Sequence, residues 1–332
     1  MSSMINDLQN PGSLPDMTEN IQVIQTHISI VFVADEFVYK VKKPVNFGFL
    51  NFSSLEKRNF YCHREVKLNR RLSEGIYIDV LPIYLNEKTY TMRDGQGEIV
   101  EYAVKMKRIP DDKLMKEMFG SGLLLNDHLK RVAGVLADFH SNAENSPEID
   151  QFGRPESFQV NTDENFEQVE KYRGITIEEK TFDAIRVWTD VFYRSNKDLF
   201  FERIKSGRIR DCHGDLHMEH ICLTDPLQII DCIEFNDRFR YSDTIADIAF
   251  LLMDLEYHGG KDEAKTLWKY YKELAKEKDV NALLSFYKVY RAFVRGKVIS
   301  FQLDDESISR KEKEEAVDKA KKYFKLACSY TQ

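Results

Sequence analysis

The chain has 332 residues, of which 42% are hydrophobic and 31% are charged, and its formal net charge is -7. A chain of this length and composition can bury a sizeable core, and it is long enough for two lobes. The negative charge argues against diffuse binding to nucleic acid or to an anionic membrane surface. We therefore expect any anionic ligand to be met by a local group of cationic side chains.

The cysteines and the start of the chain indicate the compartment. The five cysteines are scattered, without a CxxC pair or the spacing of a disulfide framework. The first residues, MSSMINDLQNPGSLPD, lack the basic flank and the apolar stretch of a signal peptide. No stretch approaches the ~20 apolar residues of a membrane span. These features predict a protein of the reducing cytoplasm.

The first third of the chain is rich in predicted strands. After an irregular lead-in over residues 1–20, apolar or alternating runs are separated by turn residues. These runs cover residues 21–25, 28–34, 37–42, 79–85 and 98–109. One long helix interrupts them, and it is expected to begin at Ser53, with Glu56 completing a capping box, and to end at about Leu72.

The remainder of the chain is mostly helical in pattern. Helical spacing of apolar residues covers 127–140, 181–205, 243–257 and most of 262–328. Between these helices, two short apolar runs flank an Asp-Pro turn in HICLTDPLQIID, which predicts a small hairpin. This segregation of strands and helices predicts an α+β fold with two lobes, residues 1–108 and 109–332, and a hinge at Met106–Arg108.

The strongest chemical signal is the run HGDLHMEHICLTDPLQIID from His213 to Asp231. The protein-kinase catalytic loop has a histidine, one spacer residue and an aspartate, followed five residues later by a metal ligand. The run from His213 has the same spacing. In that layout Asp215 accepts the proton of the substrate hydroxyl, and His213 braces the loop. Because the hairpin folds back, Asp231 is expected beside His220, which makes these two residues candidate metal ligands.

Lys40 is the candidate cation for the phosphates of a nucleotide. The run VYK that ends at Lys40 is similar to the kinase strand VAIK, whose lysine pairs with phosphates and with a helix glutamate. Glu65 falls in the apolar stripe of the predicted long helix, where a buried carboxylate needs a cation. Lys40 is its best-placed partner, while Lys42 shares the same strand face. The alternatives are that these lysines only protect a strand edge and that Glu65 extends to solvent or pairs with a neighbour on its own helix.

The phrases VYKVKKPVNFGFLNF and IIDCIEFNDRFRYSDTIADIAFLLMDLE, with the loop between them, resemble the aminoglycoside phosphotransferase-like kinases of the protein-kinase-like superfamily. The resemblance covers residues 26–303 and implies a two-lobed kinase fold, with a small antiparallel-sheet lobe that holds one long helix and a larger helical lobe. It also implies ATP, Mg or Mn, and a small-molecule acceptor. The match is strongest for a branch of uncharacterised bacterial and archaeal proteins, and in many members of that branch a P-loop ATPase half follows the kinase-like part. The chain has no GxxxxGK[ST] run, so we expect a stand-alone kinase-like unit.

The same resemblance assigns further roles. The aspartate of DIA, Asp247, is expected to brace the catalytic loop, and Met106 is expected to contact the nucleotide at the hinge. The first strand connection lacks glycine, so Thr26 and Ser29 are candidates for phosphate contacts, and a plain hairpin turn is the alternative. His220 stands where the family has a metal-binding asparagine. Because imidazole suits Mn or Zn better than Mg, this departure predicts a softer ion or a site held mainly by Asp231.

For several charged residues the sequence allows either a functional or a structural role. Glu234 is a candidate for metal or substrate contacts, or for a salt bridge with Arg238 or Arg240. His140 closes the run LADFH, where a structural role at the helix end is favoured.

A basic stripe lies on the helix FYKVYRAFVRGKV. Lys288, Arg291 and Arg295 occupy positions i, i+3 and i+7 of this run. Arg291 and Arg295 are candidate acceptor-binding residues, and a salt-bridged structural face is the alternative.

Three functions follow as hypotheses. The first is an ATP-dependent kinase that transfers the γ-phosphate to a hydroxyl of a sugar, amino sugar or amino alcohol. The second is a metal-dependent hydrolase built on the histidines at 213, 217 and 220 with Asp231. The third is a degenerate kinase that binds nucleotide as a regulator.

Overall fold

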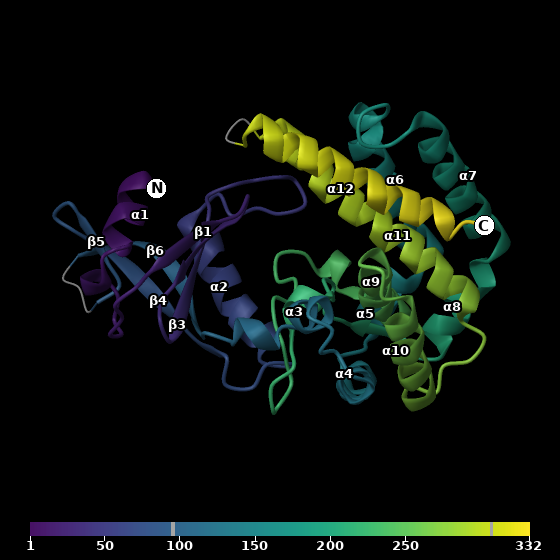
Figure 1. The fold of residues 1–332 in the computed structure, drawn as a ribbon, viewed down its shortest axis with the longest axis horizontal. Coiled ribbons are helices and arrows are strands. Elements are labelled where there is room, and N and C mark those ends of the chain that lie inside the picture. The colour runs from purple at the N-terminus through teal and green to yellow at the C-terminus, as the bar shows by residue number, and fades with distance from the viewer. Residues whose placement is uncertain (94–96, 306–307) are drawn as a thin grey trace. The chain divides into compact units, whose positions relative to one another are not determined.

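The computed structural model describes residues 1–93, 97–305 and 308–332 (Figure 1). The chain forms two compact units, Met1–Leu123 with Glu219–Asp237, and Leu124–Met218 with Arg238–Gln332. The functional division at residue 108 stays a prediction. The boundary between the two compact units follows Leu123. The segment that carries Asp231 belongs to the first unit.

The first unit is built on a six-stranded sheet with the order β1-β2-β3-β6-β4-β5, in which all neighbours are antiparallel. Its strands are β1 (Gln22–Gln25), β2 (Ser29–Val33), β3 (Phe37–Lys42), β4 (Tyr77–Asn86), β5 (Thr89–Thr91) and β6 (Glu98–Lys107). The predicted strands are confirmed, with ends that differ by at most two residues. Only the short β5 was not predicted.

One face of this sheet is covered by the start of the chain. Along β3 the side chains alternate, and Tyr39 and Val41 point to an apolar cluster that includes Met4 and Leu8. Met4 and Leu8 lie one turn apart on helix α1 (Ser2–Leu8), so they present one apolar edge to the sheet. The irregular lead-in expected for residues 1–20 is therefore wrong for this segment, because the helix buries its apolar side chains there.

The opposite face carries helix α2 (Leu55–Asn69). Its N-cap is Ser54, whose hydroxyl accepts a hydrogen bond from the amide of Lys57 at 3.3 Å. The predicted start at Ser53, with Glu56 in a capping box, is thus off by one residue. Cys62 and Val66 pack against the sheet in one apolar cluster, and the helical repeat places Glu65 between them on the same buried face.

The first unit also contains helix α3 (Met115–Gly120) and the predicted hairpin. The hairpin strands are β8 (Ile221–Cys222) and β9 (Gln228–Ile229). Their register pairs Ile221 with Ile229, as the two apolar runs around the Asp-Pro turn predicted. The amide of Ile229 donates to the carbonyl of Leu72 at 3.0 Å, so the hairpin is anchored beside the end of α2.

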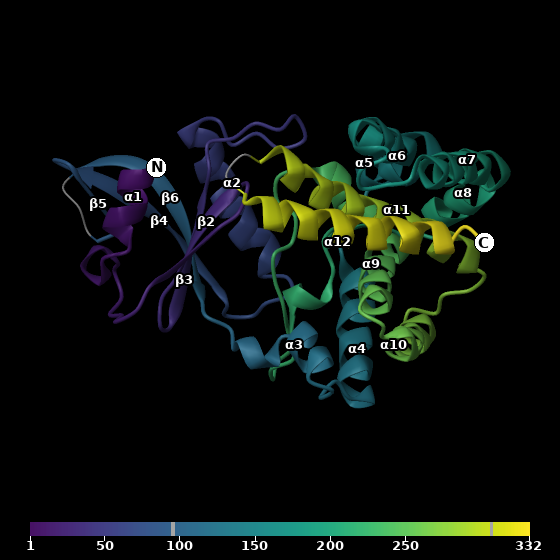
Figure 2. The same cartoon turned by 45° about the horizontal axis from the view of Figure 1, so that its top comes forward.

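The second unit is largely helical (Figure 2). Its helices are α4 (Asn126–Asn142), α5 (Pro147–Asp150), α6 (Pro155–Val169), α7 (Glu179–Ser195), α8 (Lys197–Lys205), α9 (Thr244–Tyr257), α10 (Lys261–Leu274), α11 (Asn281–Ser300) and α12 (Arg310–Ser329). Strands β7 (Ile209–Asp211) and β10 (Tyr241–Asp243) form a short antiparallel pair that was not predicted. The region 181–205, expected as one helical stretch, is divided at Asn196, whose φ of -129° is not helical. Helix α6 was also not predicted.

The core of the second unit lies between α9, α11 and α12, and Figure 2 shows α11 and α12 side by side. Phe250 of α9, Phe293 of α11 and Phe324 of α12 belong to one buried cluster. Asp243 caps α9 by accepting a hydrogen bond from the amide of Ile245 at 2.9 Å, which confirms a predicted start of this helix. No helix among the described residues is long and apolar enough to cross a membrane. The predicted α+β class, with a sheet followed by a helical remainder, is confirmed.

Candidate functional site

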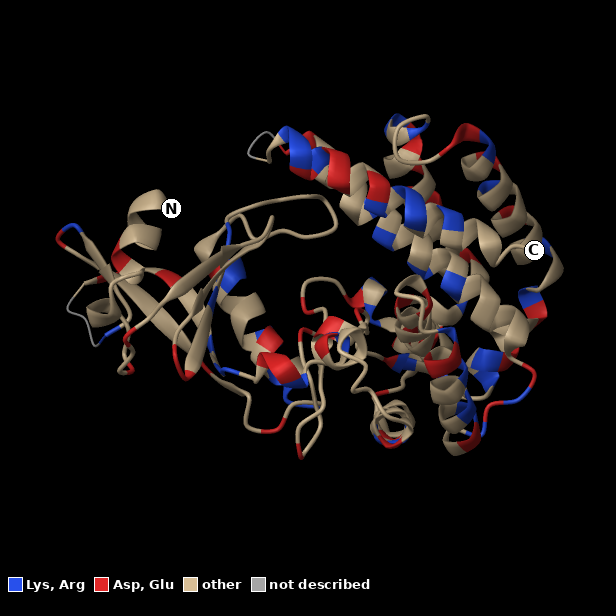
Figure 3. Cartoon of the chain, viewed as in Figure 1, with Lys and Arg blue, Asp and Glu red and all other residues tan. Residues whose placement is uncertain are grey.

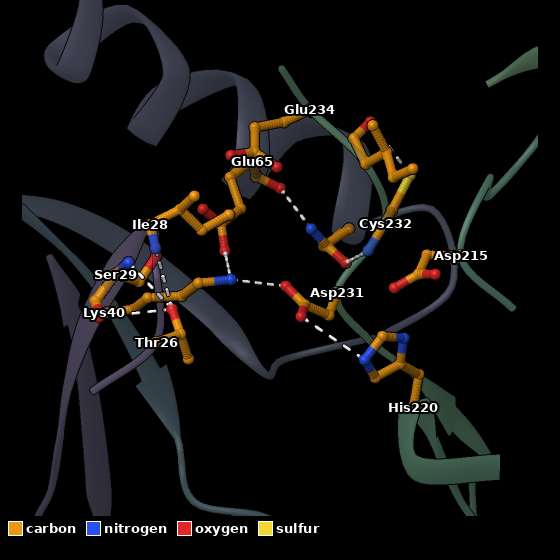
Figure 4. A network of polar contacts seen from close by, with 12 residues as sticks. Thr26, Ile28, Ser29, Lys40, Glu65, Asp215, His220, Asp231, Cys232 and Glu234 are labelled. Carbon is orange, nitrogen blue, oxygen red and sulfur yellow. Dashed lines mark hydrogen bonds and ion pairs between the residues drawn. The ribbon is translucent and has the colours of Figure 1, made fainter. Parts of the chain in front are cut away.

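In the first unit, Lys40 lies between two carboxylates from different elements (Figure 4). Its Nζ is 3.0 Å from Oε1 of Glu65 on α2 and 2.5 Å from Oδ1 of Asp231 beyond β9. The predicted ion pair between strand and helix is confirmed. The structure adds that the same ammonium also binds the aspartate expected to hold metal, so one side chain joins the sheet, the helix and the hairpin.

A second lysine completes the network. Lys42 follows Lys40 by two residues on the same strand face, and its Nζ is 2.6 Å from Oε2 of Glu65. Lys42 also pairs with Glu234, and all three of these side chains are buried. Glu65 is therefore held by both lysines, where the sequence left the choice between them open.

The position of Glu234 changes its interpretation. The sequence suggested metal, substrate, Arg238 or Arg240 as its partner, whereas its carboxylate accepts a hydrogen bond from the buried Lys42. In the second unit, Arg238 pairs with Glu164. Glu234 is only 5% exposed, and this burial favours a role in holding the site together over contact with a substrate.

The electrostatics of the network favour the charged forms of Lys40 and Glu65. Burial works against the charge of Lys40, but Asp231 and Glu65 outweigh it, so the pKa of Lys40 lies well above its ordinary value. Burial is likewise outweighed at Glu65, whose pKa is lowered by Lys40 and Lys42. Burial raises the pKa of Glu234. Among these carboxylates Asp231 is the most exposed, at 42% of its side chain, so it is the one best placed to attract a divalent cation.

The backbone around Asp231 is unusual. Asp231 has a φ of 61°, in the left-handed region, which costs about 1–3 kcal/mol unless the surroundings stabilise it. Its amide donates to the hydroxyl of Tyr77 at 3.1 Å, and the next amide, of Cys232, donates to Oδ1 of Asn69 at 2.8 Å. Asn69 also donates to the carbonyl of Glu65 at 2.9 Å. The end of α2 therefore supports Asp231 and Glu65 together, a role of Asn69 that the sequence did not indicate.

His220 and Asp231 are placed as two ligands of one ion would be. Nε2 of His220 is 3.5 Å from Oδ2 of Asp231. Two ligand atoms that are each about 2.1 Å from a shared ion lie roughly 3.0–3.4 Å apart, so a small movement suffices. The nitrogen and oxygen donors suit Mn or Zn, while Mg prefers oxygen ligands. The pair therefore fits the metal-binding role predicted for it.

The proposed nucleotide contacts at the first turn have less support. The hydroxyl of Thr26 accepts hydrogen bonds from the amides of Ile28 and Ser29 at 3.3 and 3.0 Å. Because these groups already bond one another, the turn is favoured as a plain hairpin turn. Met106 lies on β6, in register with Val38, and packs against the α2 cluster. Its contact with a nucleotide stays a prediction.

In the second unit, the loop of Asp215 is braced by Asp247. The two carboxylate oxygens of Asp247 accept hydrogen bonds from the amides of His213 and Gly214, at 2.9 and 2.8 Å. Nδ1 of His213 accepts one from the amide of Asp215 at 3.3 Å. The bracing contacts predicted for Asp247 and His213 are present, and they leave one third of the Asp215 side chain exposed.

His140 contacts Asp247 and supports its position. It is buried, with Nδ1 2.8 Å from the hydroxyl of Tyr271 and Nε2 3.2 Å from Oδ2 of Asp247. Burial disfavours the charge of Asp247, but the hydrogen bond to His140 and the charges of His140, His213 and Arg291 hold the pKa of Asp247 well below its ordinary value. These contacts agree with the structural role favoured for His140.

Arg291 contacts the same loop from α11. It is buried, and it donates to the carbonyls of Gly214 at 2.8 Å and Ala246 at 3.0 Å. Lys288, on the same helix, pairs with Glu256 at 2.6 Å. These positions favour the structural interpretation for Lys288 and a bracing role for Arg291, in place of the acceptor contact suggested for it.

Replacement of Arg291 by Ala is expected to lower the free energy of unfolding by about 3 kcal/mol, because two buried carbonyls lose a charged donor. The measurement is urea unfolding of the purified protein. Arg194→Ala, at an exposed position of α7, is the control and should stay close to the wild type. A normal unfolding free energy together with a raised KM for the acceptor would contradict the bracing role.

Comparisons with known proteins agree with this arrangement. The model of the phosphotransferase enzyme family matches residues 62–280. Uncharacterised proteins of Mycobacterium tuberculosis and Mycobacterium bovis are 34% identical over 279 residues, which is 84% of this chain and 54% of theirs. The chain thus spans about half the length of the curated relatives it matches.

Two solved structures share the fold. A choline/ethanolamine kinase family protein from Mesorhizobium loti has a TM-score of 0.52 and 13% identity, and the match covers 95% of this chain and 92% of that one. A putative aminoglycoside phosphotransferase from Ralstonia eutropha has a TM-score of 0.50 and 13% identity, with 98% of both chains covered. This likeness concerns the fold alone. The family model, which matches about two thirds of the sequence, goes further: the chain belongs to the phosphotransferase enzyme family.

Proposed function

We propose that this protein is a small-molecule kinase that transfers the γ-phosphate of ATP to a hydroxyl group. The observation that carries the proposal is Lys40, whose ammonium is held between Glu65 and Asp231. A lysine fixed by a helix carboxylate and by a metal-binding aspartate is the arrangement with which kinases bind nucleotide phosphates. Membership of the phosphotransferase enzyme family supports the same reaction class.

In the proposed reaction Lys40 binds the nucleotide phosphates, and Asp231 and His220 hold a divalent cation. When bound, this cation would neutralise charge on the phosphate oxygens. Asp215 orients the acceptor hydroxyl and accepts its proton, which then passes to water. The acceptor oxygen forms a bond to the γ-phosphorus as the bond to the bridging oxygen of ADP breaks. Because the loop of Asp215 is braced by Asp247, His213 and Arg291, the base is positioned before the acceptor arrives.

The test is turnover with a chemically broad acceptor panel. Purified protein is incubated with ATP, Mg or Mn, and sugars, amino sugars, amino alcohols and their acidic derivatives, and products are identified by mass spectrometry. We expect ADP and a phosphorylated acceptor in equal amounts. ATP binding without turnover across the panel would favour the regulator, and stoichiometric zinc in the purified protein would favour the hydrolase. Against the hydrolase, His213 is fully buried and its Nδ1 already accepts a hydrogen bond from the amide of Asp215.

The His220→Asn variant is expected to have a several-fold lower ratio of Mn-supported to Mg-supported activity, because an amide oxygen replaces an imidazole nitrogen. The ratio is measured as initial rates at saturating metal, together with a calorimetric titration of Mn. His63→Asn makes the same substitution at an exposed position of α2 and should leave the ratio unchanged. Equal ratios in all three proteins would mean that His220 is not a ligand.

A further inference from the structure

Arg295 differs from the other basic residues of α11, which recur along this helix (Figure 3). Lys288 pairs with a carboxylate and Arg291 with two carbonyls. Arg295 has no carboxylate within ion-pair distance among the residues that the structure describes, and its Nε is buried without a hydrogen-bond acceptor. Its guanidinium lies over the ring of Tyr323 on α12, 5.8 Å from the centroid. Arg295 is therefore a largely enclosed cation that meets the Tyr323 side chain, while its Nε has no acceptor among the described residues.

The helix places this cation beside the candidate base. Arg291 donates to the carbonyl of Gly214, the residue before Asp215, and Arg295 follows one helical turn later on the same face of α11. Burial disfavours the charge of Arg295, yet Tyr323 and Asp215 keep its pKa above the ordinary value. The negative charge of Asp215 thus favours the charged form of Arg295.

A second carboxylate that favours the charge of Arg295, Asp254, is engaged elsewhere. Asp254 of α9 is buried, and its Oδ2 accepts a hydrogen bond from the amide of Met218 at 3.0 Å. Its Oδ1 faces Nε2 of His258 at 3.7 Å. Asp254 therefore stabilises the charged form of Arg295 through electrostatic attraction. It does not form an ion pair with the guanidinium.

We propose that Arg295 binds the acceptor and that the acceptor carries an anionic group, a carboxylate or a phosphate, in addition to the hydroxyl that is phosphorylated. A guanidinium removed from water without an anionic partner is unfavourable, and its planar fork matches the two oxygens of a carboxylate or phosphate. The inference rests on the proposed kinase function and narrows its acceptor class. Sugar acids, hydroxy acids and sugar phosphates fit, while acceptors with only amino groups are repelled by the charge of Arg295.

The experiment uses acceptors that share one carbon skeleton. Glucose, glucosamine, gluconate and glucose 6-phosphate form one set, and glycerol, 3-amino-1,2-propanediol, glycerate and glycerol 3-phosphate form another. Binding of each is measured by thermal shift and phosphorylation by ADP release. We expect the anionic members to bind and react best, and the comparison of the carboxylate with the phosphate member identifies the anion.

The variant Arg295→Gln is expected to raise KM for the best anionic acceptor by about 10- to 100-fold and to leave KM for ATP nearly unchanged. Arg295→Lys keeps the charge but loses the fork, so it should recover only part of the affinity. Lys288→Gln removes the same charge from the same helix, at its pair with Glu256, and serves as the control.

The outcomes separate this inference from the kinase proposal. Phosphorylation of neutral or amino acceptors that Arg295→Gln does not affect would overturn the inference and leave the kinase intact. A fall in kcat for every acceptor alike, with a shifted acid limb of the pH profile, would mean that Arg295 acts on Asp215, which also overturns it. Anion binding that is lost in Arg295→Gln, without ADP release, would support the inference and refute the kinase. Neither binding nor turnover of any acceptor in the two sets, whether anionic, neutral or amino, would refute both.

Discussion

Replacement of Asp215 by Asn is expected to lower acceptor phosphorylation by about 10²- to 10⁴-fold, the usual effect of losing a general base. ATP binding should stay close to that of the wild type, because Lys40, Glu65 and Asp231 form a network of their own in the first unit. The amide of Asn keeps the size of the side chain, so the loop held by Asp247 should keep its conformation.

The measurement is single-turnover phosphoryl transfer at saturating ATP, with nucleotide affinity from calorimetry. Asp318→Asn, an exposed aspartate on α12 of the second unit, is the matched control and should have wild-type rates. A rate for Asp215→Asn within about threefold of the wild type would remove Asp215 from the proton transfer. Weakened ATP binding with a normal rate constant would instead assign it a role in nucleotide binding.

The positions of the main candidate site residues could be predicted because they follow from short sequence patterns. The spacing of His213, Asp215 and Asp231 fits within one loop and one hairpin, and the hairpin follows from two apolar runs around a turn. The position of Glu65 follows from the helical repeat, since a carboxylate in an apolar stripe needs a cation. Strand periodicity also placed Lys40 and Lys42 on one face, and both lysines bind Glu65.

The remaining contacts depend on residues far apart in the chain. Lys42 and Glu234 are separated by 192 residues, and no local pattern links a strand lysine to a loop glutamate. The support of Cys232 by Asn69 is of the same kind, since Asn69 reads as an ordinary polar residue at a helix end. Helical periodicity correctly placed Arg291 and Arg295 on one face of α11, but their different partners come from loops and helices that the pattern does not specify.

The two lysines of β3 differ in how they contribute to the site. Lys42 lies between two buried carboxylates, from α2 and from the segment after β9, so it links these elements inside the first unit. Lys40 is more exposed, at 15% of its side chain against 1% for Lys42. This difference favours Lys42 for assembly of the site and, under the proposed function, Lys40 for contact with the ligand, because the more exposed side chain has more room to meet a phosphate.

Substitution of Lys42 is therefore expected to affect mainly the stability of the protein, and substitution of Lys40 mainly the binding of nucleotide. Lys42→Met should lower the free energy of unfolding by about 3–5 kcal/mol, since it leaves Glu65 and Glu234 buried without their shared cation. Lys40→Met should lower it far less, because Glu65 keeps Lys42 and Asp231 is partly exposed. Lys40→Met should instead lower kcat/KM for ATP by about 10²- to 10³-fold, as expected when one charged donor to the transition state is removed.

Urea unfolding and steady-state kinetics of both variants test this contrast, and a double-mutant cycle of Lys40→Met with Glu65→Gln measures the coupling. The effects of this pair on nucleotide affinity should be less than additive, because Glu65 acts on the nucleotide through the lysine it orients. Full additivity would mean that Glu65 has no part in orienting Lys40. If Lys42→Met were as stable as the wild type while Lys40→Met unfolded readily, the two roles would be exchanged, and Lys42 would become the candidate for phosphate binding.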